Sequence, residues 1–199
     1  MRIGILAESD YDTLILQELT KKVASQATPP IRSVEFLPAH EAHGTVIPDM
    51  ELASSLFFGG AKKVDCTLFG IDLDQNPRRR RIVNDFVKVK AEGGLLIVPL
   101  FSDPHVEEIL FADGGNAIKS VLIGLSPEAA LPYGDLPPKK RLQKLIRDFG
   151  PRELSLTDKD VYRSIAAAVD LDQLSRGSAN FKRFRERFLR GISFGTIDA

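Results

Sequence analysis

A short run of largely apolar residues, Cys66 to Ile71, is the feature that most constrains the fold of this chain. Polar and apolar residues do not alternate along the run, so the strand that it predicts has both faces buried. Strands of this kind belong to parallel sheets that helices cover on both sides. Two further runs, Arg2 to Ala7 and Leu95 to Leu100, share this apolar character and predict two more buried strands.

Segments with apolar residues at helical spacing separate these strands. We expect helices over residues 11–27, 49–58, 79–93, 106–112, 116–122, 139–149, 158–169 and 179–191. We also expect a strand over 31–37, a loop over 40–48 and an irregular crossing over 124–138, which is rich in proline and glycine. Strands that alternate with helices predict an α/β fold with a Rossmann-like, mostly parallel sheet flanked by helices.

The composition limits the domain organisation of the chain and indicates the compartment and the kinds of partner that suit it. The 199 residues suffice for an α/β core over 1–123 and a helical C-terminal extension over 124–199 that packs on this core. Lys and Arg number 27, as do Asp and Glu, so nucleic-acid binding requires a local basic patch. The single cysteine excludes an intramolecular disulfide and fits a reducing cytoplasm. No apolar stretch approaches the ~18 residues of a membrane span, and we expect no signal peptide.

Acidic side chains directly follow two of the predicted strands. Asp72 and Asp74 come after the strand that ends at Ile71, and Glu8 comes after the first strand. In an extended segment, residues two apart point to the same side, and the carboxyl ends of parallel strands share one edge of the sheet. If the two strands are neighbours, the three carboxylates converge there and suit Mg²⁺ or Mn²⁺. The alternative is that these acids only cap the helices that follow.

The pattern Glu8-(x)3-Asp12 after the first predicted strand, followed by Asp72-x-Asp74 after a later one, resembles the TOPRIM family. This family is found in topoisomerases, primases and overcoming-lysogenisation-defect nucleases, and the chain resembles most of all its small stand-alone bacterial members. Three later stretches share the resemblance, which covers nearly the whole chain. Pro104 to Asp113 resembles the family's Glu-x-aromatic-Leu-Leu-Ala-Asp helix, and Asp158 to Asp170 its late helix. Asn180 to Phe184 resembles its closing Ser-Phe-x-x-Phe motif.

The resemblance implies a TOPRIM form of the Rossmann-like fold and a role for each acid. Asp72 and Asp74 would be the primary ligands of Mg²⁺ or Mn²⁺. Glu8 would be the general acid or base and a partial ligand, and Glu107 a catalytic acid near a second metal or in the outer shell. The implied partner is nucleic acid, either DNA or RNA. A protein partner encoded nearby is also compatible with the resemblance.

Four consecutive arginines, Arg78, Arg79, Arg80 and Arg81, follow the acids at the start of a predicted helix. Basic side chains beside a metal site bind a phosphodiester backbone. The alternative is that they form the solvated first turn of a helix, where positive charge is mildly unfavourable. We therefore treat all four as candidate nucleic-acid-binding residues.

Three functions fit this pattern. The leading hypothesis is Mg²⁺-dependent hydrolysis of nucleic-acid phosphodiesters in a defence or mobile-element setting. The second is a catalytically weak, partner-dependent TOPRIM-like subunit that binds nucleic acid or a nucleotide, and the third is a Rossmann-like small-molecule protein with an acidic pocket. Ser9 stands where the family has glycine and Asn76 where it has a third acid, which favours the second hypothesis. The intact Glu8, Asp72 and Asp74 favour the first.

Overall fold

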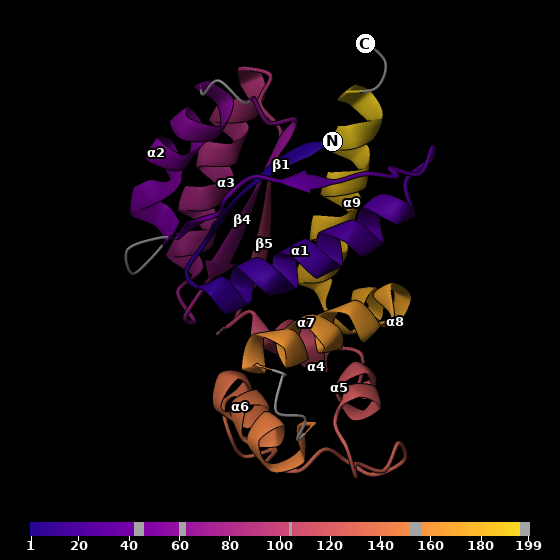
Figure 1. The fold of residues 1–199 in the computed structure, drawn as a ribbon. Coiled ribbons are helices and arrows are strands. Elements are labelled where there is room, and N and C mark those ends of the chain that lie inside the picture. The colour runs from indigo at the N-terminus through magenta and orange to yellow at the C-terminus, as the bar shows by residue number, and fades with distance from the viewer. Residues whose placement is uncertain (42–45, 60–62, 104, 152–156, 196–199) are drawn as a thin grey trace.

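The computed structural model describes residues 1–41, 46–59, 63–103, 105–151 and 157–195. A parallel sheet lies between layers of helices, as the sequence predicts (Figure 1). Its strands are β1 (Arg2–Ala7), β2 (Glu35–Phe36), β3 (His40–Glu41), β4 (Cys66–Asp72) and β5 (Ile97–Ser102). The helices are α1 (Asp10–Ser25), α2 (Val46–Gly59), α3 (Pro77–Glu92), α4 (Glu107–Phe111), α5 (Asn116–Val121), α6 (Pro138–Phe149), α7 (Asp158–Ala168), α8 (Leu171–Gly177) and α9 (Ala179–Gly195). Within the described ranges, none of these helices is long and apolar enough to cross a membrane.

The strand order is β2-β1-β4-β5, and β3 also pairs with β1. Every one of these pairings is parallel. β2 pairs with the start of β1 and β3 with its end, so the two form one interrupted edge strand. Pro38 lies between them and has no N–H to donate to a ladder. The predicted strand over 31–37 is therefore reduced to β2, and the predicted loop over 40–48 contains β3 and the start of α2.

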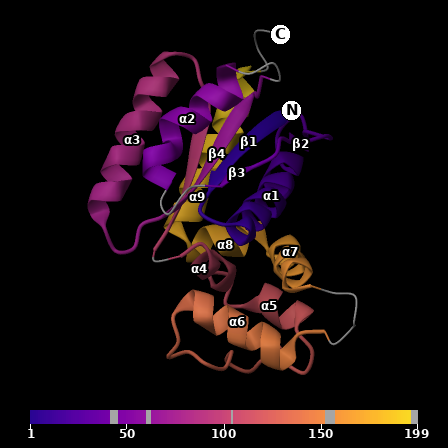
Figure 2. The same cartoon turned by 60° about the vertical axis from the view of Figure 1, so that its left-hand side comes forward.

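Each face of the sheet has its own hydrophobic core. Ile3 and Ile5 of β1 pack on the face covered by α1 and α9, whereas Leu6 packs on the face covered by α2 and α3. Helices after residue 123 share the first of these cores, and α9 contributes the buried Phe181, Phe184 and Phe188. Figure 2 shows α9 against the sheet and α4 to α7 gathered beyond the end where β5 leads into α4. The predicted apolar stripe of the last helix is thus part of the core.

The short helix α8 was not predicted. Its start depends on Asp170, whose carboxylate accepts hydrogen bonds from the backbone N–H groups of Asp172 and Gln173 at 2.9 and 2.8 Å. This is an N-cap, which satisfies N–H groups that lack a partner in the helix itself. A helix of this length gives little periodic signal in the sequence.

Gly4 of β1 allows α2 to lie directly on the sheet. A Cβ atom at this position would lie 2.6 Å from the Phe57 ring. Gly4→Ala should therefore destabilise the fold by about 2 kcal/mol, the usual effect of overpacking, and lower the melting temperature by roughly 5 °C. Gly59→Ala is the matched control, because a Cβ there meets nothing within 4 Å. Equal thermal melts for the two variants would contradict this account of α2 packing.

Candidate active site

The strand order creates a topological switch point at the carboxyl end of the sheet. The chain leaves β1 through α1 on one face and leaves β4 through α3 on the other. Because β1 and β4 are neighbours, their outgoing connections diverge, and open α/β sheets bind ligands at such a switch point. Glu8 directly follows β1 and Asp72 is the last residue of β4, so both predicted acids belong to the strand ends at this switch point.

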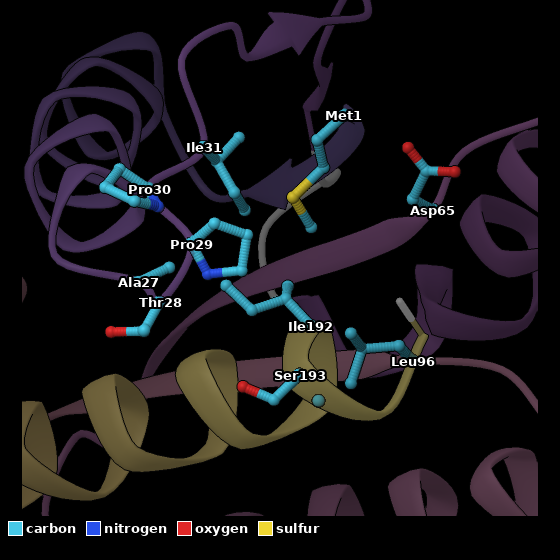
Figure 3. Close-up of a pocket in the computed structure, with 11 residues that line it drawn as sticks. Met1, Ala27, Thr28, Pro29, Pro30, Ile31, Asp65, Leu96, Ile192 and Ser193 are labelled. Carbon is cyan, nitrogen blue, oxygen red and sulfur yellow. The ribbon is translucent and has the colours of Figure 1, made fainter. Parts of the chain in front are cut away.

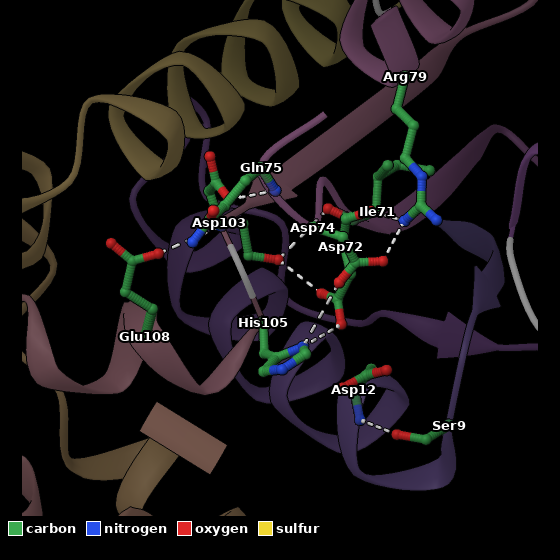
Figure 4. A network of polar contacts seen from close by, with 11 residues as sticks. Ser9, Asp12, Ile71, Asp72, Asp74, Gln75, Arg79, Asp103, His105 and Glu108 are labelled. Carbon is green, nitrogen blue, oxygen red and sulfur yellow. Dashed lines mark hydrogen bonds and ion pairs between the residues drawn. The ribbon is translucent and has the colours of Figure 1, made fainter. Parts of the chain in front are cut away.

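Asp72 is a buried carboxylate that is held at both oxygens (Figure 4). Only 9% of the residue is exposed. Its Oδ1 accepts a hydrogen bond of 2.9 Å from the hydroxyl of Ser102, its neighbour in register on β5. Its Oδ2 lies 3.2 Å from Nδ1 of His105. Burial raises the pKa of Asp72, although both of these partners act in the opposite direction.

Two more buried carboxylates, Asp12 and Glu107, come from the first turns of α1 and α4. They are 7% and 2% exposed. Figure 4 shows the Asp12 carboxylate turned toward Asp72. Burial, and then the charges of Asp72 and Glu107, raise the pKa of Asp12 to about 7. Burial also raises the pKa of Glu107, and the charge of Asp72 adds to that rise. We call these three mutually repelling groups the carboxylate cluster.

Asp74 lies beside Asp72 but is more exposed. Oδ1 of Asp74 lies 4.0 Å from Nδ1 of His105, and Oδ2 of Asp72 lies 3.2 Å from the same nitrogen, so the two carboxylates share one side of the strand end, as the sequence predicts. The φ angles of 47° at Asp74 and 57° at Gln75 turn the chain after β4. The side chain of Asp74 is 44% exposed and forms an ion pair with Arg79, which also donates to the backbone carbonyl of Asp72 at 2.8 Å. Asp74 therefore lies at the rim of the site, whereas Asp72 is buried within it.

Ser9 and Asn76, the two departures from the TOPRIM pattern, are helix caps. The Ser9 hydroxyl accepts a hydrogen bond from the backbone N–H of Asp12 at 3.3 Å, and this cap fixes the first turn of α1. Asn76 Oδ1 accepts from the backbone N–H of Arg78 at 3.1 Å and caps α3. Glu8 is half-buried between β1 and the Ser9 cap. Asp12, four positions later in this segment, is electrostatically coupled to Asp72.

The four arginines at the start of α3 fall into two pairs. Arg79 holds the turn after β4, and the guanidinium of Arg80 lies 4.7 Å from the centre of the Phe101 ring. Both are partly buried, and burial lowers the pKa of Arg80. Arg78 and Arg81 are exposed. Arg78 and Arg81 are therefore open to a phosphate, while Arg79 and Arg80 already support the fold.

The carboxylate cluster has the ligand chemistry of a divalent-cation site. Among the residues that the structure describes, no three His, Cys, Asp or Glu side chains stand in an arrangement ready to hold a metal ion. Carboxylate oxygens are nevertheless the ligands that Mg²⁺ and Mn²⁺ prefer, and a cation removes the repulsion between them. The charge of Lys139 already lowers the pKa of Asp12 and of Glu107. The donor set therefore fits such a cation, provided that the side chains draw together around it.

The sequence interpretation named Asp12 in the TOPRIM-like motif but not as a site residue, and it did not name Ser102 at all. Asp12 did give a signal, because it precedes Leu16 and Leu19 by four and seven residues and so lies on the buried stripe of α1. A carboxylate on such a stripe is unusual. Ser102 gave none, since its contact depends on the register of β4 and β5. Glu107 was a candidate, and the structure places it in the cluster; Pro104, in the same motif, lies outside the described residues.

No protein-family model, no curated protein and no solved structure matches this chain. The TOPRIM resemblance of its motifs therefore stays a proposal. The function has to be argued from the geometry and charge of the site itself.

Proposed function

We propose that this protein is a Mg²⁺- or Mn²⁺-dependent nuclease that hydrolyses phosphodiester bonds in nucleic acid. The observation that carries the proposal is the carboxylate cluster, three buried acids at the switch point of a parallel sheet. Buried carboxylates that raise one another's pKa destabilise a fold, and such groups concentrate at functional sites. A divalent cation stabilises the cluster, and phosphodiester hydrolysis is chemistry that oxygen-bound Mg²⁺ serves.

Each group at the site has a chemical role in this proposal. When bound, the cation supplies a water of lowered pKa and neutralises charge on the leaving oxygen. Asp72 is the best-placed ligand because both of its oxygens are already oriented. Asp12 and Glu107 complete the ligand set from α1 and α4. Nδ1 of His105, at 3.2 Å from Asp72 and 4.0 Å from Asp74, is positioned to hold a proton at the edge of the cluster.

The TOPRIM resemblance supports the same chemistry. Glu8 follows the first strand, and Asp72 and Asp74 follow the strand beside it, the order that the family pattern requires. In this interpretation Glu8 transfers the proton and Asp74 is a second ligand at the rim. Arg78 and Arg81 bind the phosphodiester backbone, since both are exposed close in sequence to Asp74.

A second function, a catalytically weak nucleic-acid or nucleotide-binding subunit that depends on a partner protein, has its own support. Asp74 is paired with Arg79, and Ser9 and Asn76 are engaged as helix caps. Three positions that the family pattern links to catalysis are thus committed to structural contacts. Such a subunit would bind its ligand at the same carboxyl end of the sheet and would cleave no phosphodiester bond.

Cleavage assays separate the two functions. With Mg²⁺ or Mn²⁺, wild type should cleave plasmid, single-stranded DNA or RNA. Glu8→Gln should lower that rate by about a hundredfold or more, because glutamine keeps the shape but transfers no proton. Glu186→Gln, on the exposed face of α9, is the matched control and should retain full activity. Salt-sensitive binding by wild type, with none of the three substrates cleaved, would establish the binding subunit instead.

A further inference from the structure

A cavity of about 500 Å³ lies between α1, α6 and α7. Its described lining combines basic and aromatic side chains: Lys140, Lys144 and Arg147 of α6, Tyr11 of α1, and Tyr162 of α7. Asp158, at the first turn of α7, is the one carboxylate in that described lining. In both views of the fold, α6 lies beyond α7 on the side away from the sheet (Figures 1 and 2). The described part of the lining therefore carries a net positive charge, although the whole chain carries none.

The basic side chains form one row on α6. Lys140, Lys144 and Arg147 are spaced by four and three residues, so they fall on the same helical face. Nζ of Lys144 lies 4.3 Å from the centre of the Tyr133 ring, and Arg147 pairs with Asp148 at 3.1 Å. Within the part of the chain that the structure describes, Lys140 has no hydrogen-bond or ion-pair partner. Among the described residues, Lys140 has no carboxylate partner, and Lys144 forms no ion pair although its charge acts on Asp148. Both ammonium groups are therefore open to an anion.

Two tyrosines that line the cavity lie next to the carboxylate cluster. Tyr11 directly precedes Asp12, and its ring centre lies 4.6 Å from that of Tyr162. Tyr162 is buried, and after burial the charge of Glu107 contributes most to raising its pKa, so the two side chains are neighbours. Lys139, which acts electrostatically on the cluster, directly precedes Lys140. The first turn of α6 therefore lies close to the cluster.

Another cavity in the described part of the chain differs in chemistry. It has a volume of about 410 Å³ and lies where α9 approaches the start of β1 (Figure 3). Apolar side chains such as Ile31, Leu96 and Ile192 line it, together with the carboxylate of Asp65. No lysine or arginine occurs in its described lining, and the charge of Asp65 would repel a phosphate.

We propose that the cavity between α1, α6 and α7 binds the phosphate backbone of a single-stranded nucleic acid next to the bond at the carboxylate cluster. This inference rests on the proposed nuclease function and names its substrate class. Lysine ammonium groups bind phosphates as point charges, and a tyrosine such as Tyr11 offers a surface on which a base can stack. One strand fits into a concave cavity of this size, whereas a duplex needs an open basic surface.

Binding measured without metal tests the cavity separately from catalysis. In EDTA, the affinity for a labelled single strand of about 15 nucleotides is compared between wild type and Lys140→Gln/Lys144→Gln. Loss of two phosphate contacts should lower the salt slope by about 1.4 and weaken binding roughly tenfold at ~0.15 M salt. Lys182→Gln/Arg187→Gln is the matched control, with the same change in charge at exposed positions of α9 that do not line the cavity. Glutamine retains helix propensity in both variants.

The results distinguish a failure of the cavity proposal from a failure of the proposed nuclease function. Equal affinities in the two double variants, or no binding of the single strand by wild type, would overturn the cavity proposal. An equal loss of affinity for the matching duplex would overturn its assignment to single strands. If Lys140→Gln/Lys144→Gln cleaved the single strand at the wild-type rate, the cavity proposal would be wrong while the nuclease function would stand. Cavity-dependent binding with no cleavage would support the cavity and reject the nuclease.

Discussion

Asp72→Asn should abolish metal-dependent cleavage, with a loss in kcat/KM of at least about a thousandfold, equivalent to about 4 kcal/mol. Asparagine keeps the shape of the side chain and can still accept the hydrogen bond that Ser102 donates at 2.9 Å. It removes the negative charge, however, and a neutral amide oxygen is a much weaker partner for Mg²⁺ than a carboxylate. The rise in melting temperature that Mg²⁺ causes by binding the native state should vanish with the activity.

Asp85→Asn is the matched control for this experiment. It makes the same chemical change on α3, where the side chain is 72% exposed and its contact with Arg81 is a weak 3.8 Å. We expect wild-type cleavage and a wild-type Mg²⁺ shift from this variant, measured as initial rates and as thermal melts. If Mg²⁺ raised the melting temperature of Asp72→Asn as much as that of wild type, the metal site would have to lie elsewhere.

Asp12→Asn should make the metal-free protein more stable above neutral pH. Burial and the charges of Asp72 and Glu107 raise the pKa of Asp12 to about 7 in the folded state, against 3.8 as its ordinary value. The native state therefore holds a proton that the unfolded chain has released, so wild-type stability is full below about pH 4 and falls as pH rises to about 7. Asparagine removes this loss, which we place at about 4 kcal/mol, or roughly 10 °C in melting temperature, at about pH 8.

Thermal melts at about pH 5 and pH 8, with and without Mg²⁺, test this expectation. Wild type should lose stability between the two pH values in EDTA and recover it when Mg²⁺ is added, because the cation replaces the proton. Asp12→Asn should show a weaker pH dependence and a smaller Mg²⁺ effect, while Asp85→Asn should follow wild type. If the melting temperatures of wild type and Asp12→Asn changed in parallel with pH, the pKa of Asp12 would not be raised in the folded state.

Much of the fold could be predicted from local patterns. The structure has β1 at the predicted bounds, and β4 and β5 within three residues of theirs. These strands are continuous apolar runs, and only a sheet covered on both faces buries such runs. The edge of the sheet was predicted less well. β2 and β3 are each two residues long and exist only because β1 offers them partners, which no local pattern reports.

The candidate site was predicted in part, and the errors have a common cause. Asp72 was placed correctly at the end of a buried strand, because strand ends are visible in the sequence. Asp74 was expected to share a side of the strand end with Asp72, and both carboxylates do lie within 4.0 Å of Nδ1 of His105. No local pattern reported that Asp12 and Ser102 join them, because those contacts depend on the placement of α1 and on the register of β4 and β5.

The sequence by itself determined that this chain forms a parallel α/β sheet and that acids follow its first and central strands. Apolar periodicity and strand-end chemistry are local properties, so the order of the residues is enough to indicate both. Only the tertiary structure decided which carboxylates meet. Asp12, Asp72 and Glu107 come from a helix, a strand and a second helix, and they are brought together by the strand order and by the packing of α1 and α4 at the carboxyl end of the sheet. The charge coupling of such a cluster falls steeply with distance, so it cannot be known until those elements are placed.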